Sequence, residues 1–277
     1  MFFPFSRPAY VLVAHGSRDP RPGQALASLA DGMAEELQRR SPDSSPMVRG
    51  AELECQPTSL ADQILEIHRS AQAQNRDGLV IIPLFLSAGV HAMEDIPEAI
   101  AEAQCKLATL AETSDRPALP MVTAPVLGKH PAWATWIQTH WASQLDPSRT
   151  PVLMGHGTRR VGGNQGLEAL GRSLGARLAF WSIAPKLPET LDALETQGQT
   201  ELTLLPHFLF EGGITDAIAR QIQAFSDQIS SDQISVVQRQ PFGHSPAFAD
   251  FLAQAYGGAP QPPTETDPDR RPELSLV

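Results

Sequence analysis

The stretch Tyr10-Val-Leu-Val-Ala14 is apolar and leads directly into His15-Gly16-Ser17-Arg18. A second apolar run, Pro151-Val-Leu-Met154, leads into Gly155-His156-Gly157-Thr158-Arg159. Two further pairs of segments match in the same order, namely 79–86 with 202–209 and 128–133 with 243–248. The offset between matched positions shrinks along the chain. These matches predict an internal duplication whose second copy has shorter connections.

Each copy alternates short apolar runs with longer segments of helical spacing, such as Leu26, Leu29, Met33 and Leu37. This alternation is typical of a parallel sheet, whose strands are buried on both faces. We therefore expect an α/β fold with two similar halves, each a four-stranded parallel sheet flanked by helices. The expected strands are 10–14, 48–53, 79–85 and 121–124 in the first copy, and 151–154, 177–183, 201–206 and 234–238 in the second.

The domain boundaries follow from the repeat and from composition. We expect a first domain over residues 1–145 and its repeat over 150–256. Residues 257–277 carry five prolines among acidic side chains, which is typical of a disordered tail.

Composition excludes several classes of partner. The 277 residues carry a formal net charge of −10 without a Lys/Arg run, which argues against nucleic acid as a partner. A polyanionic ligand would have to be held by local cations. The two cysteines, Cys55 and Cys105, cannot build a disulfide framework. Neither a signal peptide nor a membrane span is evident, so we expect a soluble, cytoplasmic protein that does not act at a membrane.

Polar side chains follow the predicted strands where ligands bind in such sheets, beyond the carboxyl ends. His15 and His156 both lie there, as do the segments after Pro83 and Pro206. A single His-Gly turn is more often structural. Because the cluster recurs at His156, we interpret it as part of a site.

A third histidine, His91, follows Gly89 and precedes Glu94 and Asp95. The acids alone suit the first turn of a helix. In the expected sheet order, however, His91 and His15 come from neighbouring strand ends. Two neutral imidazoles suit a borderline divalent ion such as Co²⁺, Fe²⁺ or Ni²⁺, although two histidines alone do not identify a metal site.

The remaining candidates have two interpretations each. Glu54 is either a solvated acid at a strand end or a carboxylate of the site, and His207 is either a ligand or a core histidine. The helix face of Trp133, Trp136, Ile137 and His140 favours a core role. Five cations are candidate anion clamps: Arg18, Arg21, Arg159, Arg160 and Lys186. Four histidines are interpreted as structural: His68, His130, His140 and His244.

Nucleotide-binding motifs are missing. The chain contains no G-x-x-x-x-G-K-[ST], and Gly155-His-Gly157 lacks the third glycine of a dinucleotide fingerprint. A nucleotide-driven reaction is therefore unsupported.

Three motifs together carry a family resemblance. V-A-H-G-S-R at 13–18, I-P-L-F-L-S-A-G-V-H-A-M-E-D-I-P at 82–97 and L-P-H-F-L-F-E-G-G at 205–213 resemble the sirohydrochlorin chelatases of the CbiX/SirB type. These are class II cobaltochelatases or ferrochelatases, which need neither a metal cofactor nor a nucleotide. The similarity covers about residues 9–255 and matches the long, duplicated form. It implies two flavodoxin-like halves with a cleft between them.

The resemblance also implies roles for individual residues. His15 and His91 match the two catalytic histidines that present the metal, and Glu54 best matches the glutamate of the site. The second copy keeps His156 but has Ile214 at the position of His91, so catalysis is expected in the first half. A histidine or Glu54 would accept the pyrrole protons. The expected substrate-binding residues are Ser17, Arg18, Gly89, His156, Arg159 and His207.

The expected function is insertion of Co²⁺ or Fe²⁺, with Ni²⁺ as a further option, into sirohydrochlorin for cobalamin or siroheme biosynthesis. The metal would be a substrate, with no cofactor bound permanently, and the chain would be a monomer with an internal pseudo-dimer. The alternative is a non-catalytic carrier of metal or tetrapyrrole. A histidine phosphatase is a weaker alternative, because Ala14 stands where that family has arginine.

Overall fold

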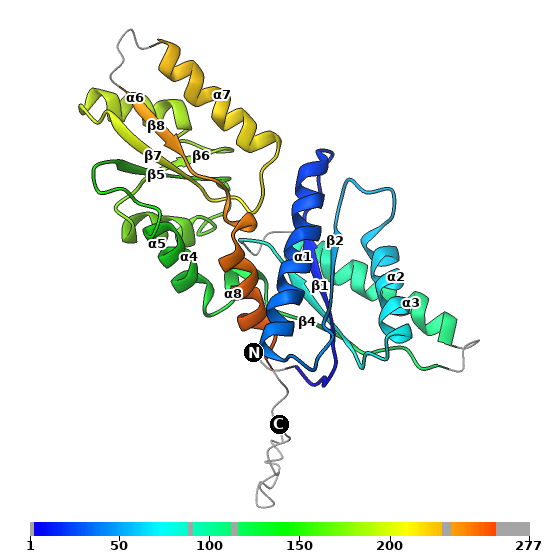
Figure 1. Ribbon diagram of the computed structural model, residues 1–277. Helices are drawn as coiled ribbons and strands as arrows, with labels where there is room; N and C mark the ends of the chain where they lie inside the picture. Colours follow the sequence, from blue (N-terminus) through cyan, green and yellow to red (C-terminus); the bar gives the residue numbers. More distant parts are fainter. Residues whose placement is uncertain (1–2, 88–90, 112–115, 229–233, 259–277) are drawn as a thin grey trace, which may run out of the picture.

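The computed structural model describes residues 3–87, 91–111, 116–228 and 234–258. It consists of two α/β halves, each built on its own sheet (Figure 1). The first ten elements are β1 (Ala9–Ala14), α1 (Pro20–Arg40), β2 (Met47–Glu52), α2 (Leu60–Ala73), β3 (Leu79–Pro83), η1 (His91–Asp95), α3 (Ile96–Ala111), β4 (Met121–Thr123), η2 (Leu127–Lys129) and α4 (Trp133–Ala142). The others are β5 (Thr150–Gly155), α5 (Gln165–Ser173), β6 (Arg177–Phe180), α6 (Leu187–Thr196), β7 (Glu201–Pro206), α7 (Gly213–Gln228), β8 (Ser235–Gln238), η3 (Phe242–His244) and α8 (Pro246–Tyr256).

Both sheets are parallel and have equivalent strand orders, β2-β1-β3-β4 and β6-β5-β7-β8. All six residues of β1 are buried, as a central strand with helices on both faces requires. The predicted α/β class with two four-stranded parallel sheets is confirmed. Strands β3 and β6 end two and three residues earlier than predicted, at Pro83 and Phe180, because the apolar run continues into the loop beyond each strand. Strands β4 and β8 are each one residue shorter than predicted.

Helix α1 follows the carboxyl end of β1, and its local sequence determines where the helix begins and which face is buried. The Asp19 side chain caps its first turn by accepting a hydrogen bond from the Arg21 N–H, and Pro20 stands at the first helical position, where its missing N–H costs nothing. The helix buries the apolar stripe recognised in the sequence, including Leu29 and Met33, against the sheet.

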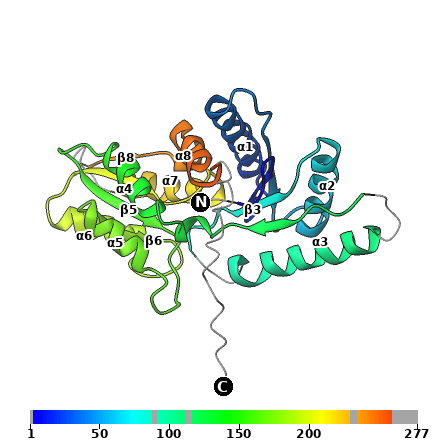
Figure 2. The same cartoon turned by 90° about the horizontal axis from the view of Figure 1, so that it is seen from below.

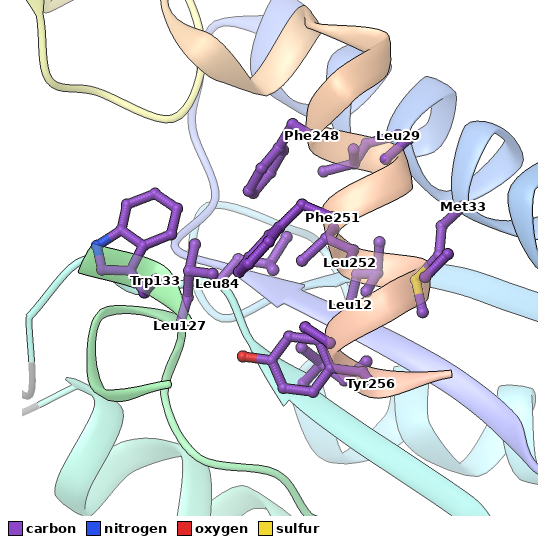
Figure 3. Packing of buried hydrophobic residues seen from close by; sticks show 14 of the residues in the cluster. Leu12, Leu29, Met33, Leu84, Leu127, Trp133, Phe248, Phe251, Leu252 and Tyr256 are labelled. Atoms are coloured by element: carbon purple, nitrogen blue, oxygen red, sulfur yellow. The ribbon is translucent and has the colours of Figure 1, made fainter. Parts of the chain in front are cut away.

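The last helix of each copy lies on the other half. Helix α8 packs against α1 beside the first sheet, and α4 packs against α5 beside the second (Figures 1 and 2). Figure 3 shows Phe248, Phe251, Leu252 and Tyr256 of α8 gathered with Leu12 of β1 and with Leu29 and Met33 of α1. Each half of the structure is therefore built from two stretches of sequence, and the division of the chain into domains at 1–145 and 150–256 stays a prediction.

This exchange has a physical reason. The apolar faces of α4 and α8 each need a partner surface, and the chain reaches the neighbouring half through short connections after β4 and β8. The result is one apolar cluster that includes residues of both sheets, such as Leu12 and Leu153. Within the described ranges, the chain has no helix that is long and apolar enough to span a membrane.

Candidate functional site

His15 and Glu54 lie side by side at the carboxyl edge of the first sheet. Strands β1 and β2 pair Ala14 with Glu52, and the ladder continues because the Glu54 N–H donates to the His15 carbonyl at 2.9 Å. The His15 Nδ1 atom is 4.0 Å from the Glu54 Oε2 atom. The two side chains are 51% and 47% exposed, so an imidazole and a carboxylate are jointly accessible to a ligand.

Gly16 is required by this arrangement. Its φ of +92° lies in the region that favours glycine, and a Cβ atom there would stand 2.1 Å from the Glu54 carbonyl oxygen. A side chain at position 16 would therefore push the two strand ends apart. The glycine after His15 holds the imidazole close to the carboxylate, which accounts for the His-Gly pair in the sequence.

Phe85 forms an apolar wall beside this pair. It follows β3, whose extension is fixed by a 2.8 Å hydrogen bond from the Leu84 N–H to the Val13 carbonyl. The Phe85 ring lies 6.3 Å from the His15 ring, centroid to centroid. Neighbouring strand ends thus supply an imidazole, a carboxylate and an aromatic ring to one edge.

Ser17 and Arg18 lie in the loop between β1 and α1. The Ser17 Oγ atom accepts a hydrogen bond from the Asp19 N–H at 3.0 Å, so this hydroxyl helps to shape the loop. The Arg18 side chain is exposed at the same edge.

The side chain of His91, the predicted partner of His15, is not among those that the structure describes. His91 begins the π-helix η1, which follows β3 in the chain, but its side chain and the whole of Gly89 lie outside the described residues. The pairing of His15 with His91 stays a prediction. Among the described side chains, which exclude that of His91, no three His, Cys, Asp or Glu residues form a group able to hold a metal ion.

The second half repeats the backbone geometry of this edge with different side chains. The Ser182 N–H donates to the His156 carbonyl at 2.8 Å, as Glu54 does to His15, so Ser182 stands at the position of Glu54. The Ser182 hydroxyl donates to the Gly157 carbonyl at 2.8 Å, and the His156 Nδ1 atom lies 3.0 Å from the same oxygen. This copy offers an exposed imidazole without the carboxylate.

His207 lies among aromatic rings. Its ring centroid is 6.3 Å from that of Trp133 and 5.9 Å from that of Phe242, and its Nδ1 atom is buried without a hydrogen-bond partner among the described residues. Burial lowers the pKa of His207 to about 4, so its imidazole is neutral at physiological pH.

The candidate anion clamps differ in how they are held. Arg159 and Arg160 are exposed in a loop that Thr158 and Asn164 brace through two mutual hydrogen bonds of 2.9 Å. The Lys186 Nζ atom donates to the Trp181 carbonyl. Arg21 forms ion pairs with two aspartates, one of them in the second half, a contact that the sequence pattern did not reveal.

The structural assignment of His68 agrees with its surroundings. Its Nε2 atom accepts a hydrogen bond from the Leu119 N–H at 2.8 Å, and burial lowers its pKa. His130 is buried against Phe251 and Tyr256, and His140 stacks on Trp136 at a centroid distance of 4.9 Å. The rings that His130 and His140 contact belong to the apolar cluster that joins the two halves or pack against it.

Comparison with known proteins gives a consistent result. A sequence model of a family described as CbiX matches residues 9–143 and 150–259. A sirohydrochlorin cobaltochelatase from Methanopyrus kandleri is 33% identical over 90 residues, which are 32% of this chain and 56% of that protein. The aligned segment thus spans about half the length of this relative.

Two solved structures share the fold over nearly their whole length. SirB from Bacillus subtilis with Fe³⁺ has a TM-score of 0.65 and 18% identity, covering 91% of this chain and 96% of that chain. The sirohydrochlorin chelatase SirB from Bacillus subtilis subspecies spizizenii, in complex with cobalt, has a TM-score of 0.63 and 19% identity, covering 91% and 95%. At these identities the likeness concerns the fold.

Proposed function

The chain belongs to the CbiX family, and from that premise we propose that it is a sirohydrochlorin chelatase, a lyase that inserts Co²⁺ or Fe²⁺ into the tetrapyrrole without a nucleotide. The observation that carries this proposal is the His15–Glu54 pair, held 4.0 Å apart at the carboxyl edge of the first sheet. Imidazole and carboxylate are suitable ligands for such ions. An exposed pair of this kind suits a metal that must arrive and then leave.

In the proposed reaction, His15 and His91 present the metal to one face of the macrocycle. As the ion binds the ring nitrogens, the pyrrole N–H protons must leave, and Glu54 or a neutral histidine accepts them. The product is the metallated ring, and the protons pass from the accepting side chain to solvent. The Phe85 ring offers the macrocycle an apolar surface beside the metal.

We propose that the second half binds substrate. It has Ser182 where the first half has Glu54, so it lacks the carboxylate that would accept protons but keeps an exposed imidazole at His156. Sirohydrochlorin carries many carboxylates, and arginine binds carboxylates with matched geometry. The proposed set is His156, Arg159 and His207 in this half, with Ser17, Arg18 and Gly89 in the first.

The proposal extends to the setting of the reaction. The chain would act in the cytoplasm as a monomer whose two halves form a pseudo-dimer, and the product would enter siroheme or cobalamin synthesis. The duplicated architecture supports the pseudo-dimer, because the two sheets have equivalent strand orders.

The test is metal insertion by the purified chain. Sirohydrochlorin is mixed anaerobically with Co²⁺ or Fe²⁺, and the visible absorption bands of the tetrapyrrole are followed with and without protein. We expect insertion well above the protein-free rate, and a comparison of the two metals identifies the preferred ion. Binding of tetrapyrrole without any gain in rate would instead identify a carrier and contradict the proposal.

A further inference from the structure

Arg21 joins the two halves at the edge where the strands end. Its guanidinium donates from Nε to Asp19 at 3.1 Å, and from Nη1 and Nη2 to the two carboxylate oxygens of Asp216 at 3.0 and 2.5 Å. Arg21 lies in the first turn of α1 and Asp216 in the first turn of α7, two helix ends that approach each other in Figure 1. The ion pair therefore crosses from one half to the other.

This bridge lies close to the candidate site along the chain. Asp19 is tied through its N–H to Ser17, two residues after His15. The second half also approaches the first at Gly212, where a Cβ atom would lie 3.4 Å from the Cγ atom of Pro22. The loop that carries His15 therefore leads directly into the ion pair that contacts the second half.

The two aspartates of the bridge have different structural duties. Asp19 caps α1 by accepting a hydrogen bond from the Arg21 N–H, so its removal would disturb the helix. The Asp216 carboxylate is linked to the first half through Arg21, and both side chains are about two-fifths exposed. Exposed ion pairs contribute little to stability, so the Asp216 contact can be replaced without unfolding either helix.

We propose that Arg21 is a carboxylate-exchange site: the Asp216 carboxylate that pairs with its guanidinium gives way to a carboxylate of the bound substrate. The guanidinium fork suits bidentate binding of any carboxylate, whether from Asp216 or from a ligand. The chain has a net charge of −10, so few cations are available for a polycarboxylate ligand. In the proposed exchange, Asp216 neutralises the Arg21 guanidinium until such a ligand binds. The identity of the ligand rests on the proposed function.

A second ion pair serves as a matched control. Arg40, at the other end of α1, contacts Asp250 of α8 at 2.7 Å, and its exposure is similar to that of Arg21. Asp216→Ala and Asp250→Ala remove the same charge, so a general electrostatic effect would be shared by both variants. An effect on the exchange site would be confined to Asp216→Ala.

The experiment measures the dissociation constant of metal-free sirohydrochlorin by its absorption and fluorescence changes, without any insertion step. We expect Asp216→Ala to bind about three- to fivefold more tightly than the unaltered chain, because the internal competitor is gone. We expect Arg21→Gln to bind about tenfold more weakly, and both Asp250→Ala and Arg40→Gln to stay within about twofold.

The outcomes separate the two proposals. Weaker or unchanged binding by Asp216→Ala, in a chain that binds sirohydrochlorin, overturns the exchange and leaves the proposed function intact. Weaker binding would show that Asp216 holds the halves in a binding shape. If the unaltered chain fails to bind sirohydrochlorin, the proposed substrate is wrong, and the proposed carboxylate exchange is wrong as well.

Discussion

Ser182 occupies in the second half the position that Glu54 occupies in the first. Each donates its main-chain N–H to the carbonyl of the histidine at the end of the neighbouring strand, at 2.8 and 2.9 Å. The two copies thus share this main-chain arrangement, but only the first has a carboxylate at this position. The two copies share a scaffold and differ in chemistry.

The first prediction concerns which half binds metal. We expect His15→Ala to abolish measurable Co²⁺ binding, because it removes one ligand of a small set. We expect His15→Ala and Glu54→Gln each to slow insertion by about 100-fold or more, the second because it removes the proposed proton acceptor. His156→Ala should retain Co²⁺ binding and lose less insertion activity. Isothermal titration with Co²⁺ and the absorption assay provide the two measurements. An equal loss from all three variants would contradict the placing of the metal in the first half.

The second prediction concerns Gly16. We expect Gly16→Ala to destabilise the chain by more than about 2 kcal/mol, because the new Cβ meets the Glu54 carbonyl in addition to the cost of positive φ. Gly175→Ala is the control, since Gly175 has φ of +62° with nothing within 4 Å of a Cβ, and it should cost about 1 kcal/mol. Urea unfolding measures both. Equal costs would mean that the strand ends adjust freely.

The third prediction concerns the exchanged helix α8. Phe248 is fully buried, so Phe248→Ala should lower the free energy of unfolding by about 3–5 kcal/mol. Gln254 is exposed on the same helix, and Gln254→Ala should stay within about 0.5 kcal/mol. Denaturant titration compares the two. A small loss at Phe248 would show that α8 contributes little to joining the halves.

The fourth prediction is a pH dependence of stability from His207. Its folded pKa of about 4 lies below the usual value for histidine, so the unfolded chain binds a proton more readily. The contribution of neutral His207 to the free energy of unfolding is therefore complete above about pH 6.5. It decreases by up to about 3 kcal/mol as the pH falls towards 4.

His207→Leu tests this assignment, because Leu84 stands at the equivalent position in the first half. The variant should flatten the slope of unfolding free energy between pH 4 and 6.5, as measured by urea titrations at several pH values. His68→Leu is a less useful comparison, since His68 also accepts a main-chain hydrogen bond. An unchanged slope would assign the acid sensitivity to other groups.

The sequence predicted the strands well because a buried parallel strand leaves a local signal. The apolar run that ends at Ala14 forms β1. His15 follows β1 and Glu54 follows β2, so the two side chains lie at the same edge of the sheet, as the strand positions predicted. Periodicity likewise predicted that the face of Trp133 would be buried.

Other features depend on contacts between distant segments. An apolar helix face shows that a helix is buried but not against which half, so the exchange of α4 and α8 was not predicted. The Arg21–Asp216 bridge joins residues 195 positions apart, and neither carries a local sign of its partner. The equivalence of Ser182 and Glu54 was missed because the segments around them share no motif.

The placement of α8 on the first sheet has a consequence for synthesis in the cell. A ribosome makes the chain from the N-terminus, so β1 and α1 emerge long before α8, which completes their apolar packing. The nascent first half must expose part of its core while the second half is translated, the condition in which chaperones are recruited. The two halves therefore complete their folding together, because the last helix of each copy packs on the other half.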